Sequence, residues 1–292
     1  MTQASQGTRF STGLGPSAFQ HDLSSVQIVY HGVNKSGSMA MANAMGEAYR
    51  WAGREDEFVC HYKIRCTDQE FRDRVDAMNG SKAFIVDHYL FGALAPAPNR
   101  IWITQLRHPL PRVLSFYQWL KNKHVASTGS EDGFPALRDF VIGSQGKRHS
   151  QIAQFGTGFG PNRDLRNRRI SPADMFNIAV DAIESNVYAL GIAEYLEESI
   201  FVFAALAGIE SVAPWVRDNR NKGRPLATDI SEGERALIEE VFEYDYRLYA
   251  YALEKFRAQN SRFDFGDSLQ RYRDACRDQY KDRIIDGTVQ AS

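Results

Sequence analysis

Short apolar runs that end in turn residues alternate along the chain with segments whose apolar residues recur at helical spacing. Strands are predicted at 26–31, 58–62, 83–86, 101–106 and 187–192. Helices are predicted at 39–51, 68–78, 109–120, 173–185, 194–207 and 231–256. The last of these is the longest, and the capping box that begins at Ser231 opens it. Buried strands that alternate with helices are typical of an α/β fold with a parallel sheet.

We therefore predict a P-loop-like, three-layer α/β fold, with a central, mainly parallel sheet of about five strands flanked by helices. One domain is expected over residues 26–256. Residues 1–25 are rich in Ser, Thr, Gly and Gln and are expected to be disordered, and the heavily charged residues 257–292 to form a tail over the surface. Residues 121–172 are polar and Gly-rich, with a short helical hint at 136–142. Such a long loop-rich insertion is usually functional. We expect it on the acceptor side of a site, the side where the molecule to be modified would bind.

Composition narrows the classes of partner. The 35 basic and 36 acidic residues give a net charge of -1, which argues against a nucleic-acid binder. Cys60, Cys66 and Cys276 are odd in number and include no Cys-x-x-Cys pair, which indicates reduced thiols. The first twenty residues lack the pattern of a signal peptide, and no apolar run is long enough to cross a bilayer. A cytoplasmic protein without a transmembrane segment is expected, and its oligomeric state is not predicted.

The segment His31–Ser38 joins the first predicted strand to a helix and has the composition of an anion site. Backbone N–H groups at a helix start, together with the positive end of the helix dipole, attract phosphate groups. Lys35 adds a point charge, and the hydroxyls of Ser36 and Ser38 add donors. The segment lacks the Gly-Lys-Ser/Thr ending of nucleoside-triphosphatase loops. Taken alone, it is equally consistent with an ordinary strand-to-helix turn that carries a solvated lysine.

A second motif follows the fourth predicted strand, where Leu106–Tyr117 reads Leu-Arg-x-Pro-x-x-Arg-x-x-Ser-x-Tyr. With Lys-Ser-Gly-Ser after the first strand, it resembles the sulfotransferase superfamily, and within it the carbohydrate branch (sulfotransferase family 2) that includes heparan sulfate 2-O-sulfotransferases. The resemblance spans roughly residues 26–256, so that region is expected to be a sulfotransferase domain. It implies a 3′-phosphoadenosine-5′-phosphosulfate (PAPS) donor. The resemblance implies that Lys35, Ser36, Gly37 and Ser38 hold the phosphosulfate of this donor. It implies that Arg107 and Ser115 hold the donor's 3′-phosphate.

Three further stretches are similar to family segments. His88–Gly92 resembles a His-x-x-Phe-Gly segment, which implies that His88 is the catalytic base. Residues 191–199 resemble a stretch that we interpret as structural. Asn219–Gly223 resembles a loop that closes over a donor phosphate, which implies that Lys222 and Gly223 bind the donor. The chain also departs from the family pattern: Met39 replaces a usual hydroxyl residue, His108 a common aspartate and Asn34 a common proline.

The resemblance implies in-line transfer of a sulfuryl group to an acceptor hydroxyl. His88 would take the proton and Lys35 would neutralise the leaving phosphate, with no metal required. His31 and His61 also follow strands and are reserve candidates for the base. The resemblance favours a carbohydrate or glycoconjugate acceptor, while lipid and small-molecule alcohols remain open. Two other functions also remain open: a P-loop nucleotide kinase or hydrolase, and a catalytically degenerate nucleotide-binding module on the same fold.

Overall fold

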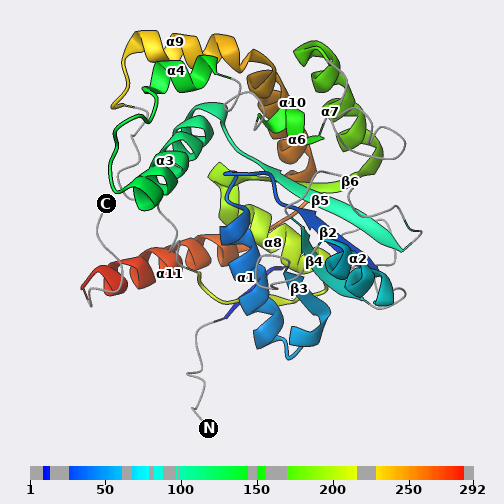
Figure 1. The fold of residues 1–292 in the computed structure, drawn as a ribbon. Coiled ribbons are helices and arrows are strands. Elements are labelled where there is room, and N and C mark those ends of the chain that lie inside the picture. The colour runs from blue at the N-terminus through cyan, green and yellow to red at the C-terminus, as the bar shows by residue number, and fades with distance from the viewer. Residues whose placement is uncertain are drawn as a thin grey trace.

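The centre of the molecule is a five-stranded parallel sheet with the strand order β3-β4-β2-β5-β6 (Figure 1). The computed structural model describes residues 9–13, 26–60, 68–78, 82–87, 97, 99–143, 150–155, 170–215 and 228–285. The strands are β2 (Gln27–His31), β3 (Phe58–Cys60), β4 (Ala83–Asp87), β5 (Arg100–Leu106) and β6 (Val187–Ile192). The predicted parallel sheet is confirmed, because near-continuous apolar runs of this kind become strands buried on both faces.

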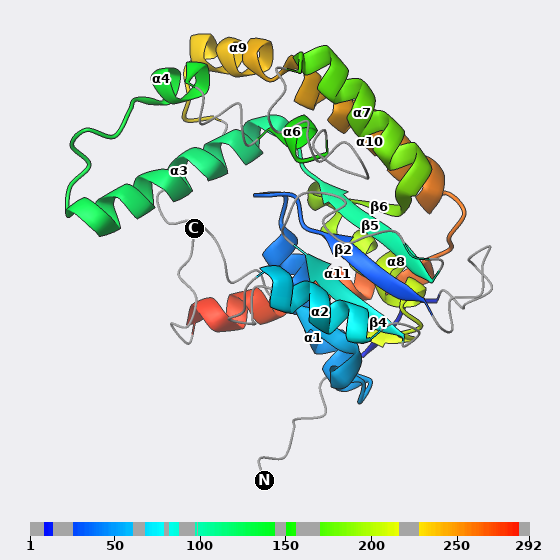
Figure 2. The ribbon, with the colours of Figure 1, turned by 45° about the vertical axis from the view of Figure 1, so that its right-hand side comes forward.

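Helices cover both faces of the sheet (Figures 1 and 2). Side chains alternate along each strand, so Ile28 and Tyr30 join one core cluster and Val29 joins the other. The first cluster contains side chains of α1 (Ser38–Trp51), α8 (Leu196–Leu206) and α11 (Gly266–Ile285). The second contains side chains of α2 (Asp68–Ala77), α6 (Gln151–Phe155), α7 (Pro172–Asn186) and α10 (Glu243–Asn260). The predicted three-layer α/β arrangement therefore holds.

A third cluster of apolar side chains lies beyond the sheet. It is built by α3 (Pro109–Thr128), α4 (Leu137–Ile142) and α9 (Glu232–Val241), which lie side by side in Figure 2. The capping box at the start of α9 is confirmed, with Ser231 and Glu234 each accepting from the other's backbone N–H. The short helix expected near 136–142 is confirmed as α4.

Two predicted helices differ from those in the structure. The helix from Pro109 continues to Thr128 rather than ending at Leu120, and it stops at Gly129, whose φ of 78° provides a left-handed C-cap. The helix predicted over 231–256 is broken at Phe242 into α9 and α10. The break lets Phe242 pack into the third cluster while Leu248 packs into the second.

The terminal regions are more structured than their composition suggests. Within the region expected to be disordered, β1 (Phe10–Ser11) pairs antiparallel with β7 (Ser211–Val212). The expected surface tail contains α11, which buries Leu269 and Tyr272 in the first cluster. Short 3₁₀ turns, η2 (Glu55–Glu57) and η5 (Ala193–Tyr195), complete the described elements. No helix in the described ranges combines the length and apolarity needed to span a membrane.

The strand order makes the carboxyl ends of β2 and β5 a topological switch point of the sheet. These two strands are neighbours, and the chain leaves β2 into α1 on the first face of the sheet. It leaves β5 into α3, which contacts α9 and α10 on the other side. In open α/β sheets, ligands bind where neighbouring strands send their connections to opposite faces. Both phosphate motifs inferred from the sequence follow these two strands.

Candidate functional site

The loop between β2 and α1 contains two residues with a left-handed backbone conformation. Lys35 has a φ of 65° and Gly37 a φ of 86°, and Lys35 is the only non-glycine residue with positive φ in the described part of the chain. A left-handed conformation costs an ordinary residue about 1–3 kcal/mol and is concentrated at functional sites. Successive N–H groups in such turns form concave anion-binding nests. At Gly37 a side chain would also be crowded, because a Cβ would lie 3.0 Å from Gln105 Nε2.

The N-terminus of α1 adds backbone N–H groups to this loop. Gly37 is the N-cap residue, and no side chain of the described residues caps the helix. The first N–H groups of any helix lack partners within the helix and carry the positive end of its dipole. Ser36 supports the turn of this loop, because its hydroxyl and its N–H both donate to Val33 O, at 2.7 and 3.2 Å. Its side chain is fully buried.

The second motif meets this loop through Arg107. Its Nη1 donates to Lys35 O at 3.0 Å, so the residue after β5 touches the loop after β2. Its Nε lies 4.0 Å from Glu194 Oε1. Glu194 also accepts from His108 N and from Tyr249 Oη, at 3.2 Å each. The guanidinium therefore lies between the loop backbone and a carboxylate that is itself held by two donors.

Lys35 points its ammonium at an aromatic ring. Its Nζ lies 4.8 Å from the centroid of Trp119, and Lys123 Nζ lies 4.1 Å from the same centroid. Burial, Arg107 and Lys123 together lower the pKa of Lys35 to about 8. Among the residues that the structure describes, no carboxylate pairs with either ammonium. The ammonium of Lys35 is thus repelled by neighbouring positive charges, and a bound anion would offset that repulsion.

One face of helix α3 lies beside the loop. Ser115, Trp119 and Lys123 are spaced four residues apart and so lie on one face of the helix. Ser115, one turn before Trp119, is buried. Arg112 reaches back from the same helix and donates from Nε to Asn34 O at 3.0 Å. Trp119 and Lys123 were missed by sequence reasoning, since only the fold brings them to Lys35.

Several predicted site residues lie outside the described residues: His88, the reserve base His61, Lys222 and Gly223. Of the others, His31 is 2% exposed, and its ring packs edge-on against Phe155 at 5.3 Å between centroids. His31, one of the two reserve candidates for the base, is therefore a buried core side chain. Met39 and Ser38 begin α1 beside the loop.

The stretch 191–199 has the structural role that we expected. Ser199 Oγ accepts from Ile192 N at 3.1 Å and donates to Tyr195 O at 2.9 Å. A Cβ on Gly191 would lie 3.0 Å from that same oxygen. The two residues thus let α8 begin close against β6, and within the stretch Glu194 lies beside Arg107.

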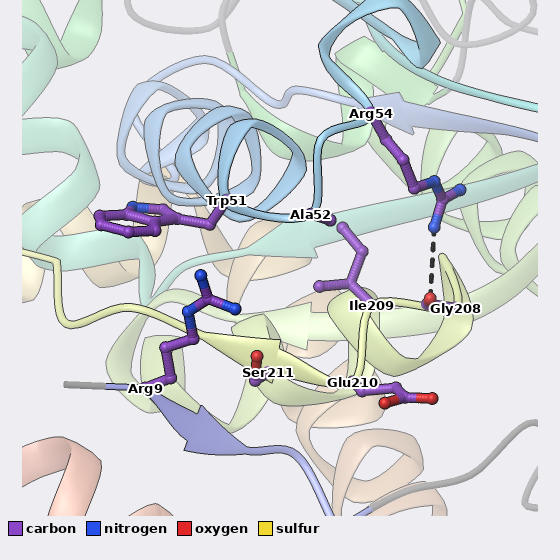
Figure 3. A pocket seen from close by; sticks show the side chains of 8 residues that line it. All are labelled: Arg9, Trp51, Ala52, Arg54, Gly208, Ile209, Glu210 and Ser211. Atoms are coloured by element: carbon purple, nitrogen blue, oxygen red, sulfur yellow. Dashed lines mark hydrogen bonds between the residues drawn. The ribbon is translucent and has the colours of Figure 1, made fainter. Parts of the chain in front are cut away.

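A cavity of about 260 Å³ lies at the opposite end of α1 from Lys35 (Figure 3). The guanidinium carbon of Arg9 lies 5.3 Å from the ring centroid of Trp51. Arg54 pairs with Glu57 and donates to Gly208 O at 3.2 Å, at the end of α8. Because Arg54 neutralises the negative end of that helix, we interpret the cavity as part of the packing between α1 and α8.

Comparisons with known proteins show a weak likeness to solved structures. No family model matches the chain, and no curated protein matches it. Among solved structures, the chain is similar to the crystal structure of retinol dehydratase in complex with androsterone and inactive cofactor PAP. That likeness has 12% sequence identity and a TM-score of 0.30, and it covers 91% of this chain and 82% of that chain. Within the described residues, no three His, Cys, Asp or Glu side chains gather as a metal site.

Proposed function

We propose that the protein is a sulfotransferase that moves a sulfuryl group from PAPS to an acceptor hydroxyl. The observation that carries the proposal is the contact between the two motifs, in which Arg107 Nη1 donates to Lys35 O at 3.0 Å. Two motifs that lie far apart in the sequence are thus in contact, and each carries a cationic side chain. A donor with phosphate at both its 5′ and 3′ positions needs two such groups at adjacent positions.

The residues present fit that donor. The start of α1 and Lys35 would hold the 5′-phosphosulfate, and Arg107 and Ser115 the 3′-phosphate. Of the predicted loop contacts, Gly37 and Ser38 stay in the proposal through their backbone N–H groups, whereas Ser36 supports the turn. Lys222 and Gly223 stay in it on the sequence pattern alone.

The chemistry requires a positive charge beside the leaving phosphate and a group that takes a proton. The bond from the acceptor oxygen to sulfur forms while the bond from sulfur to the phosphate oxygen breaks. Lys35 would neutralise the charge that develops on that oxygen, and the acceptor proton would pass to His88, the proposed base. The acceptor proposed from the sequence is a carbohydrate or glycoconjugate hydroxyl. The cytoplasm is the proposed location.

A thermal-shift titration tests the donor site. We expect 3′,5′-adenosine bisphosphate to stabilise the protein by about 2.7 kcal/mol when present at about a hundred times its Kd. Mg-ATP at the same concentration should give much less stabilisation, because it lacks the 3′-phosphate. A response to Mg-ATP alone would favour the kinase or hydrolase. Binding of the bisphosphate without transfer of labelled sulfate to any acceptor would favour the degenerate module.

The affinity for the bisphosphate should depend on pH through Lys35. The pKa of Lys35 is lowered to about 8, so its ammonium is mostly present at pH 7 and mostly lost at about pH 9. The phosphate groups are already dianionic in this range, since their second pKa is about 6. Calorimetry should therefore show an affinity that falls between these two pH values.

The control for this titration is Lys35→Arg, which keeps its charge throughout the range. Its affinity for the bisphosphate should be constant over the same pH values. A constant affinity in the unmodified protein would mean that the Lys35 ammonium does not contact the ligand.

A further inference from the structure

We propose that α6 is a clamp that fixes the Lys35 loop relative to Arg107, and that Asp245 is the positioning residue that holds this clamp. The inference rests on the proposed function, because the two segments joined by α6 are the two phosphate motifs. It also gives a role to part of 121–172, which we had expected to be on the acceptor side.

One end of the clamp is Gln151. Its Oε1 accepts from Arg107 N at 3.0 Å, and its Nε2 donates to Arg107 O at 2.8 Å. Arg107 lies one residue beyond the end of β5, and this side chain satisfies both of its backbone polar groups. Gln151 is fully buried, so water does not compete for these bonds. The direction in which the Arg107 side chain leaves the sheet is thereby fixed.

The other end is Gln154, which lies on the same face of α6. Its Oε1 accepts from Asn34 N at 2.7 Å, beside Lys35. Its Nε2 donates to Ser150 O at 3.3 Å, which orients the amide. Two glutamines on one short helix thus bind the backbones of both phosphate motifs.

Asp245 on α10 holds this helix in place. Its carboxylate accepts from Gln151 N at 2.8 Å and from Ile152 N at 3.0 Å, at the start of α6. It also lies 3.6 Å from Arg112 Nη1, and Arg112 donates to Asn34 O at 3.0 Å. Both backbone groups of Asn34 are therefore connected to Asp245, one through α6 and one through Arg112.

A helix of five residues is not stable by itself, so its position comes from these contacts and from the buried Phe155. The functional consequence concerns a ligand that spans both motifs. If the distance between the Lys35 loop and Arg107 changes slightly, such a ligand loses much of its affinity. A ligand with one phosphate is insensitive to that distance. The clamp therefore predicts a loss specific to the bisphosphate.

The test compares two glutamines that make the same kind of contact. Gln151→Met removes the two hydrogen bonds between the Gln151 amide and the Arg107 backbone. Gln259→Met removes an equivalent pair on Leu190, whose N–H and C=O each lie 3.0 Å from the Gln259 amide. Calorimetry should show that Gln151→Met weakens binding of 3′,5′-adenosine bisphosphate about tenfold, with binding of adenosine 5′-monophosphate within about twofold. Gln259→Met should change neither. Equal losses for both ligands, or the same loss in both variants, would overturn the clamp.

A second measurement does not depend on any ligand. Hydrogen exchange should be faster at the N–H groups of both Asn34 and Arg107 in Asp245→Asn, whereas Gln151→Met should release Arg107 alone. Unchanged exchange at both N–H groups in folded Asp245→Asn would overturn the clamp even if the bisphosphate binds normally. If the unmodified protein binds no bisphosphate, the proposed donor site fails while the exchange data still decide the clamp. Gln151→Met, which keeps Asp245, decides it if Asp245→Asn does not fold.

Discussion

Replacement of Lys35 by alanine should lower the rate of sulfuryl transfer from PAPS by a factor of about 10²–10³, the usual cost of losing one group that stabilises developing charge. The ammonium lies at the start of α1, confined by Trp119, Arg107 and Lys123. Its attraction to the leaving phosphate should grow as the bond to sulfur breaks. The rate constant should therefore fall far more than the affinity for the bisphosphate. Single-turnover transfer of labelled sulfate measures the first quantity and calorimetry the second.

The matched control is Lys123→Ala, which removes the same charge from the same ring and leaves Lys35 in place. Its transfer rate should stay within about threefold of the unmodified protein, as for an exposed side chain outside the reacting groups. Equal losses in the two variants would mean that Lys35 acts only through the general positive field. His88→Ala belongs in the same assay, because an unchanged rate would show that another group takes the proton.

Local patterns in the sequence were sufficient to predict the sheet. The strand at Val187–Ile192 was predicted to the residue, because a buried parallel strand is a continuous apolar run between polar segments. Helix ends were harder to predict. Lys121–Thr128 carries no apolar stripe, so the extension of α3 has no periodic signal, although Gly129 marks its end. The break at Phe242 has no breaker residue, since it arises from packing into two different clusters.

The candidate site divides in the same way. Lys35 and Arg107 were proposed from the sequence because each lies in a compact motif directly after a strand. Gln151, Gln154 and Asp245 were missed because they are polar residues buried by tertiary contacts. Such contacts produce no regular pattern of residues in the sequence. Glu194 was seen only as part of a structural stretch. A single sequence therefore reveals the groups proposed to meet the donor, but not the groups that hold them in position.

The largest expected change in stability concerns the buried pair formed by Arg112 and Asp245. Their side chains are 2% and 0% exposed. Removing one partner of such a pair leaves a buried charge without compensation and typically costs about 3–5 kcal/mol. We expect this loss in the free energy of unfolding for Arg112→Met and for Asp245→Ala, measured by urea denaturation. The double variant should lose less than the sum of the two, because neither charge is then left alone.

The pH dependence of this loss distinguishes a charge effect from a packing effect. Burial raises the pKa of Asp245, while Arg112 and the two N–H groups of α6 oppose the rise. In Arg112→Met the opposing cation is absent, so the folded-state pKa of Asp245 should rise further above its unfolded value of about 3.9. A carboxyl with a raised pKa binds its proton more tightly in the folded state, so stability is gained as the pH falls toward the unfolded pKa. The cost of Arg112→Met should therefore be clearly smaller at pH 5 than at pH 8. A cost that is the same at both values would show that Arg112 contributes by filling space and bonding to Asn34 rather than by its charge.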